Sequence, residues 1–263
     1  VSLEVCGLKK IRMMTAACLL AGLVLAGCSR QTQFTYEGSR LESMARDLQE
    51  NAQADSFAKN LCVVTGEEGE EDASVTAEAA AAFGIDSKQV IFQKNPFERL
   101  YPASITKIMT ALIAIRDGDL TDSVTVGPET VITETGASLA HINPGDTLTM
   151  EQLLYGLMLP SGNDAGAAIA VHMAGSTEAF AEKMNETAHA LGATDTHFVN
   201  PHGLNNEDHY TTAYDLYLIF NEALKYPEFR KIIGTVSYQA QYTDSTGQAK
   251  TQEWKNSNQY LNG

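Results

Sequence analysis

The sequence predicts an α+β fold, and three observations predict it. Two short apolar segments, 79–84 and 89–93, flank a turn candidate at 85–88, as expected for a β-hairpin. Segments with helical periodicity follow, and the period-two alternation typical of strands returns between residues 233 and 255. Because strands come before and after the helices rather than alternating with them, we expect an antiparallel sheet flanked by helices.

The first residues have the organisation of a secretory signal. A positive stretch that ends at Arg12 precedes an uncharged apolar segment, 13–27, which is shorter than the roughly 20 residues that a membrane-spanning helix needs. The segment runs into the tetrapeptide L-A-G-C, which resembles the lipobox of bacterial lipoproteins and ends at Cys28. The resemblance implies cleavage before Cys28 and lipidation of its thiol. An ordinary secretory signal followed by a chance cysteine is the alternative.

We therefore divide the chain into a lipoprotein signal peptide (1–27), a lipid-anchored polar tether (28–57) and a folded body (58–263). Lipid chains on Cys28 would hold the body at the extracytoplasmic face of the cell membrane. The formal net charge of -15 argues against a nucleic-acid partner, because binding to phosphates needs a basic surface.

Within the body, residues 61–65 are expected to form a short strand in which Cys62 is a buried small side chain. Apolar residues after Ser104 recur at helical spacing up to Asp117, so a buried helix is expected to begin near Ser104. Four more helices are expected at 150–159, 164–175, 176–192 and 210–224. On the last of these, Asp215 and Glu222 are expected on the solvated face.

The first chemical motif is S-x-x-K, formed by Ser104 and Lys107 at the start of the apolar helix. A spacing of three places both side chains on one helix face. A serine hydroxyl becomes a good nucleophile when a neighbouring base removes its proton, and a buried lysine with a lowered pKa is such a base. A second match, from Ser56 to Lys59, lies in the polar tether. The alternative for Ser104 is a helix cap beside a surface lysine.

The second motif is Ser161-Gly162-Asn163, which lies between two predicted helices. Its serine is suited to pass a proton to a leaving amine, and its asparagine to orient the lysine and bind a substrate carbonyl. Helix capping is the alternative, because Ser and Asn are both good caps.

Four segments together, PASITKIMTAL, SGND, FVNPHGL and TTAYDL, resemble the low-molecular-mass penicillin-binding proteins, which are serine D-Ala-D-Ala carboxypeptidases. The resemblance covers residues 79–263. It implies a β-lactamase/DD-peptidase-like antiparallel sheet flanked by helices, with a helical subdomain that carries residues 161–163.

The resemblance also implies the chemistry. Ser104 would be acylated by the peptidoglycan pentapeptide stem, with Lys107 as general base, Ser161 as proton relay and Asn163 as substrate-binding residue. Water would then hydrolyse the acyl-enzyme. β-Lactams would acylate the same serine, and no cofactor is needed.

One family motif, K-T-G or K-S-G on a strand facing the nucleophile, has no counterpart. Lys250-Thr251-Gln252 comes near it, but glutamine would obstruct the substrate where the family has glycine. The segment before Gly263 resembles the stretch that precedes the motif. We therefore expect the body to be incomplete at its C-terminus, with C-terminal strands missing, and the chain as given to be impaired. A K-[TS]-G within about the next 20–30 codons would support this expectation.

Three other functions compete with this interpretation. A class A β-lactamase shares S-x-x-K but has S-D-N and an E-x-x-L-N-like segment, which do not occur here. A non-catalytic penicillin-binding or wall-sensing domain would share the fold. A metallopeptidase would need a set of ligands, and His197, His202 and His209 are more typical of packing or surface positions, so we expect no metal.

Overall fold

The structure is a computed structural model that describes residues 61–64 and 74–261. These residues belong to one of the two compact units of the chain, Asn60–Gly263. The expected signal peptide, Cys28 and the tether lie outside the described residues. Within the described residues, no helix is long and apolar enough to cross a membrane.

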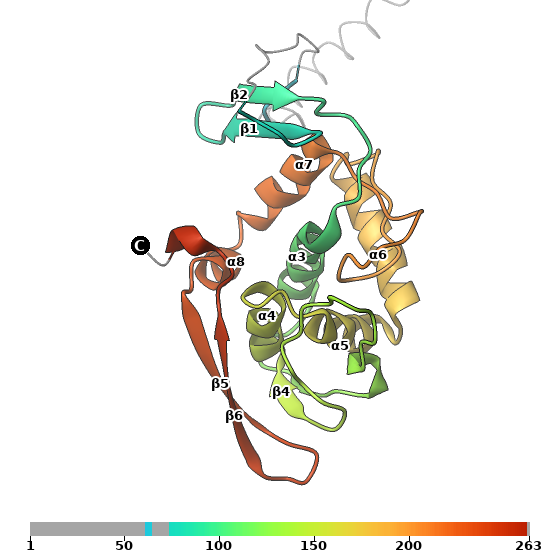
Figure 1. Ribbon diagram of the computed structural model, residues 1–263, viewed down its shortest axis with the longest axis vertical. Helices are drawn as coiled ribbons and strands as arrows, with labels where there is room; N and C mark the ends of the chain where they lie inside the picture. Colours follow the sequence, from blue (N-terminus) through green and yellow to red (C-terminus); the bar gives the residue numbers. More distant parts are fainter. Residues whose placement is uncertain (1–60, 65–73, 262–263) are drawn as a thin grey trace, which may run out of the picture. The chain divides into compact units, whose positions relative to one another are not determined.

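Two antiparallel sheets are present in the described part, so the α+β prediction is confirmed (Figure 1). The first is the predicted hairpin, and the second has the strand order β3-β4-β5-β6. The strands are β1 (Ala80–Gly84), β2 (Gln89–Lys94), β3 (Ser123–Thr125), β4 (Thr147–Thr149), β5 (Ser237–Thr243) and β6 (Ala249–Lys255).

The helices pack around a central one, α3, which contacts α4, α5, α6, α7 and α8 (Figure 1). The helices are α3 (Lys107–Asp117), α4 (Met150–Met158), α5 (Asn163–Ala174), α6 (Thr177–Ala190), α7 (Ala213–Ala223) and α8 (Pro227–Ile233). Short 3-10 turns occur at η2 (Ala103–Thr106), η3 (Pro128–Thr130) and η4 (Gln259–Leu261). Most of α3 is buried because its sequence is apolar on nearly every side, and such a helix is stable only inside the core.

Two of the local predictions are wrong. Residues 61–64 are not a strand, because tyrosine hydroxyls of α7 take the place of a strand partner: Cys62 N donates to Tyr217 Oη (2.8 Å) and Tyr214 Oη donates to Cys62 O (3.0 Å). The Cys62 side chain is fully buried, as predicted. Asp215 is also buried rather than solvated, because its carboxylate accepts hydrogen bonds from Asp195 N and Thr196 Oγ1.

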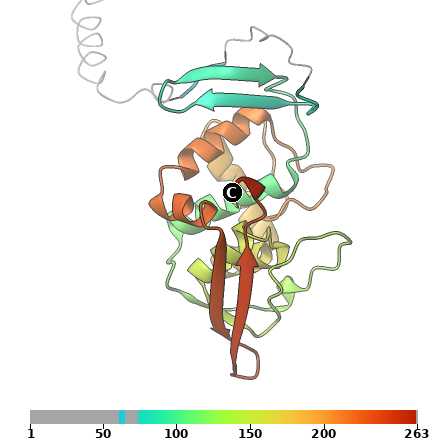
Figure 2. The ribbon, with the colours of Figure 1, turned by 60° about the vertical axis from the view of Figure 1, so that its left-hand side comes forward.

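The β5–β6 hairpin forms a long two-stranded ribbon (Figure 2), and its side chains reach the loop before β4. Trp254 Nε1 donates to Ala140 O (2.8 Å), and Lys250 Nζ pairs with Asp146 Oδ2 (2.9 Å). The charge of Lys250 is therefore paired with a buried carboxylate.

The loop between α6 and α7 is held against α6 by a single amide side chain. Asn185 Nδ2 donates to Phe198 O (2.8 Å), and Asn185 Oδ1 accepts from Phe198 N (2.7 Å). The ends of the loop are joined by a bridge between His197 and Tyr210. Asn185 thus fixes the start of a loop that has little regular structure of its own.

We predict that Asn185→Ala lowers the free energy of unfolding by about 1–3 kcal/mol, because it leaves two partly buried backbone groups without partners. Chemical denaturation measures this change. The exposed neighbour on α6, Glu186→Ala, is the control and should stay within about 0.5 kcal/mol of the parent protein. Equal losses in both variants would contradict the role given to Asn185.

Candidate active site

Ser104 and Lys107 lie together where η2 passes into α3. Lys107 Nζ is 3.1 Å from Ser104 Oγ, and the Ser104 residue is exposed whereas only 2% of Lys107 is exposed. The α-helix begins at Lys107 rather than at Ser104, and the serine lies in the preceding 3-10 turn. An exposed hydroxyl is thus placed beside an amine that is shielded from water.

The environment of Lys107 favours its neutral form. Burial lowers the pKa of Lys107 to about 8, while the negative charge of Asp164 acts in the opposite direction. The amine also donates a hydrogen bond to His202 O (2.7 Å). A neutral amine has one lone pair, and with an N–H held by His202 O that lone pair is available to the Ser104 hydroxyl.

The loop between α6 and α7 packs against the turn that carries Ser104. Thr110 Oγ1, one helical turn beyond Lys107, donates to Pro201 O (2.6 Å). Gly203 has φ +87°, and a β-carbon there would overlap the carbonyl oxygen of Ala103, the residue before Ser104. Ala103 itself has φ +47°, so two unusual backbone conformations meet directly beneath the nucleophile.

A buried histidine holds Thr106, which lies between Ser104 and Lys107 in the sequence. His209 Nδ1 accepts from Val199 N (3.1 Å), so the neutral ring carries its proton on Nε2 and donates it to Thr106 Oγ1 (2.8 Å). Burial lowers the pKa of His209 to about 4, which keeps the ring neutral at physiological pH. Sequence reasoning missed this role, because nothing in the spacing of His209 and Thr106 indicates their contact.

Ser161 and Asn163 occupy the turn before α5, but they do not cap the helix. The N-cap is Gly162, which makes no side-chain capping bond. Ser161 Oγ and Asn163 Oδ1 are buried, and neither has a hydrogen-bond partner among the described residues. Ser161 also has φ +61°, a strained conformation for serine. Buried polar atoms without partners are rare, and a bound ligand would explain them here.

Two histidines of the metallopeptidase hypothesis, His202 and His209, are buried in the α6–α7 loop. Residues 61–64 and 74–261 contain no group of three His, Cys, Asp or Glu side chains that could hold an ion. His202 Nδ1 accepts from Leu204 N, and burial lowers the pKa of His202 to about 4. The buried histidines His202 and His209 thus accept backbone hydrogen bonds within the α6–α7 loop.

The comparisons with known proteins agree on one family. The family model described as D-alanyl-D-alanine carboxypeptidase, Peptidase_S11, matches residues 66–263. D-alanyl-D-alanine carboxypeptidase DacF of Bacillus subtilis is 39% identical over 174 residues, which cover 64% of this chain and 45% of that protein. A D-alanyl-D-alanine carboxypeptidase of Streptomyces is 33% identical over 199 residues, which cover 72% of this chain and 68% of that protein.

Solved structures give the same result. The Streptomyces K15 DD-transpeptidase has a TM-score of 0.68 and 35% sequence identity, with 73% of this chain and 77% of that chain covered. A penicillin-binding protein homolog from Mycobacterium tuberculosis has a TM-score of 0.64 and 32% identity, with coverage of 75% and 72%. The chain thus spans less than half the length of the Bacillus relative and about three quarters of the structures it resembles.

We predict that Gly203→Ala severely destabilises the protein or prevents folding, because the new methyl group would overlap the backbone that carries Ser104. Gly247→Ala is the matched control: Gly247 has φ +83° and open space around it, so it should lose only about 1–2 kcal/mol for the left-handed backbone. Denaturation of both variants measures the difference. Similar losses would show that close packing under Ser104 does not matter.

Proposed function

Because the chain belongs to the peptidase S11 family of D-alanyl-D-alanine carboxypeptidases, we propose that Ser104 removes the terminal D-Ala from peptidoglycan stem peptides through an acyl-enzyme. The observation that carries this proposal is the 3.1 Å contact between the exposed Ser104 hydroxyl and the amine of buried Lys107, whose pKa burial lowers to about 8. The alternative of a helix-capping serine beside a surface lysine does not fit, because Lys107 is buried.

The reaction follows from this geometry. The neutral amine of Lys107 takes the proton of Ser104 Oγ as the oxygen attacks the carbonyl carbon of the penultimate D-Ala. The C–N bond then breaks, the leaving D-Ala amine receives a proton, and the acyl group remains on Ser104. Water attacks the ester in the second half and restores the free serine.

Ser161 and Asn163 complete the proposed site. The buried Ser161 hydroxyl would carry the proton from Lys107 to the leaving amine. Asn163 would donate to the substrate carbonyl through its amide Nδ2. Its amide oxygen has no partner in the described part of the chain and is left to accept from an N–H donor. The unpartnered Ser161 hydroxyl and Asn163 oxygen support these roles, because N–H groups of a substrate could donate to them.

The partners and location belong to the same proposal. The substrate is the pentapeptide stem of peptidoglycan, and β-lactams act as covalent inhibitors that acylate Ser104. A lipid on Cys28 anchors the protein to the extracytoplasmic face of the membrane, where this substrate is found. The L-A-G-C tetrapeptide supports the anchor, and mass spectrometry of the N-terminal peptide from membranes tests it.

A second candidate concerns the group that accepts the acyl chain. The K15 structures are titled DD-transpeptidase, and in such a reaction an amine rather than water would release the acyl group. Both reactions liberate D-Ala, so analysis of the peptide product with and without an added amine acceptor distinguishes them.

We predict that, in the full-length protein, Ser104→Ala abolishes covalent labelling by a fluorescent penicillin and the release of D-Ala from a pentapeptide, because no other side chain replaces the nucleophile. Ser56→Ala, in the second S-x-x-K sequence, is the matched control and should retain both. Gel fluorescence and a D-Ala assay measure the outcomes. Labelling that survives in Ser104→Ala refutes the proposal, and release of the label within seconds favours a β-lactamase.

We also predict that the acylation rate rises by about tenfold per pH unit below pH 8 and levels off above it, because the base must be neutral and the pKa of Lys107 is about 8. Lys107→Arg should lose acylation at every pH, because a guanidinium stays protonated. Stopped-flow measurements between pH 6 and 10 check the profile. A rate that does not change between pH 6 and 9 argues against Lys107 as the base.

A further inference from the structure

The segment 138–142 lies directly on the turn that carries Ser161 and Asn163. Asn163 N donates to Ser138 O (2.8 Å). Gly162 is so close to the segment that an added β-carbon would lie 2.8 Å from Ala140 N. The same β-carbon would lie 2.6 Å from Gly156 O of α4. The position of the segment therefore constrains the backbone of the turn.

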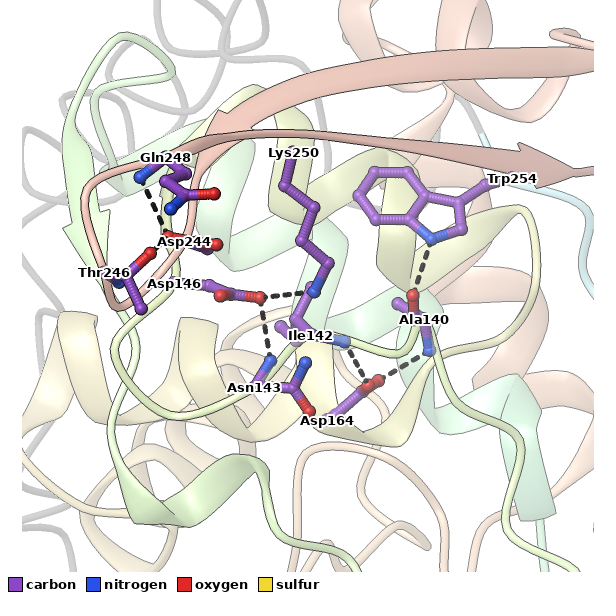
Figure 3. Close-up of polar contacts among 10 residues, drawn as sticks. All are labelled: Ala140, Ile142, Asn143, Asp146, Asp164, Asp244, Thr246, Gln248, Lys250 and Trp254. Carbon is purple, nitrogen blue, oxygen red and sulfur yellow. Dashed lines mark hydrogen bonds and ion pairs between the residues drawn. The ribbon is translucent and has the colours of Figure 1, made fainter.

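One buried carboxylate holds this segment. Asp164 Oδ1 accepts from Ala140 N (2.8 Å) and Oδ2 accepts from Ile142 N (3.2 Å), as Figure 3 shows. The residue between them, His141, has φ +61°, and this left-handed conformation lets both N–H groups reach one carboxylate. Hydrogen bonds to an ionised group are among the strongest in proteins and offset the strain at His141.

The β5–β6 hairpin holds the same segment from another direction. Trp254 Nε1 donates to Ala140 O, so the amide and the carbonyl of Ala140 are both held by buried side chains from different elements (Figure 3). Ala140 is thus the point at which the sheet and the start of α5 are joined.

The charge of Asp164 also reaches the base. Only 1% of Asp164 is exposed, and no lysine, arginine or histidine in residues 74–261 forms an ion pair with it. Its charge raises the pKa of Lys107 against the larger effect of burial. The other titratable group that faces Lys107 is His202 of the α6–α7 loop, which burial and the lysine keep neutral.

We propose that Asp164 is a positioning residue for the acyl transfer, which fixes segment 138–142 against the Ser161–Asn163 turn. The inference rests on the proposed function for its kinetic consequence. The positioning of segment 138–142 does not depend on the proposed function, because the Asp164 carboxylate holds the segment whatever the substrate is.

The test compares Asp164→Asn with Asp146→Asn. Asp146 is the matched control, because it is a second buried carboxylate of the same region and its hydrogen bonds come from Asn143 N and Lys250 Nζ rather than from segment 138–142. Two readouts are needed: amide hydrogen exchange of the peptide covering 138–142, and the pH profile of acylation by a fluorescent penicillin.

We expect Asp164→Asn to raise exchange in 138–142 by roughly tenfold or more, because one amide oxygen cannot replace two carboxylate oxygens. The plateau of the acylation rate should fall by about tenfold or more, since small displacements of catalytic groups are costly. The midpoint should move to lower pH, because the charge that favours the lysine ammonium is gone. Asp146→Asn should keep the midpoint and most of the plateau.

An unchanged plateau in Asp164→Asn, or equal effects in both variants, overturns the proposal. If the full-length protein is not acylated at all, the proposed function fails, but the exchange measurement still decides the positioning role. If Asp164→Asn does not fold, Trp254→Phe releases Ala140 from the other side. That variant should show faster exchange in 138–142 and a lower plateau with an unchanged midpoint, and unchanged exchange in it counts against the proposal.

Discussion

The burial of one amine determines how this protein is built. Lys107 lies at the first position of the central helix α3, and among the described residues its Nζ has two polar contacts, Ser104 Oγ and His202 O. An ammonium group loses much of its hydration there, so the pKa of Lys107 falls and the amine can serve as a base near neutral pH. A surface lysine at the same spacing from a serine would stay protonated.

The rest of the described structure shields this amine from water and holds it beside Ser104. Helix α3 contacts five other helices, and Lys107 at its start is only 2% exposed. The α6–α7 loop supplies the carbonyl of His202, and Gly203 lets that loop approach the backbone before Ser104. The hairpin β5–β6 and Asp164 fix the segment next to Ser161 and Asn163. Regular elements thus supply rigidity, while irregular segments between them carry the polar groups.

Much of the fold could be predicted, because its signals are local. The β1–β2 hairpin, α3 and α6 follow from apolar periodicity and from turn or capping residues such as Ser176, whose hydroxyl accepts from Ala179 N. Helix α8 was not predicted, because its seven residues are too few for a clear period. Residues 61–64 were predicted as a strand because they are apolar or β-branched. The prediction failed because such residues also occur in extended segments that hydrogen bonds from side chains hold in place.

The sequence by itself determined the chemical identity of the site: a serine and a lysine three residues apart, and a second serine and asparagine between two helices. Such spacing places side chains on one face of one element, and this relation does not depend on the rest of the chain. Only the tertiary structure decided that Lys107 is buried and that Ser161 and Asn163 leave polar atoms free rather than capping α5. Burial and hydrogen-bond partners depend on segments far away in the chain, so a pKa shift or an unpaired atom cannot be read from local spacing.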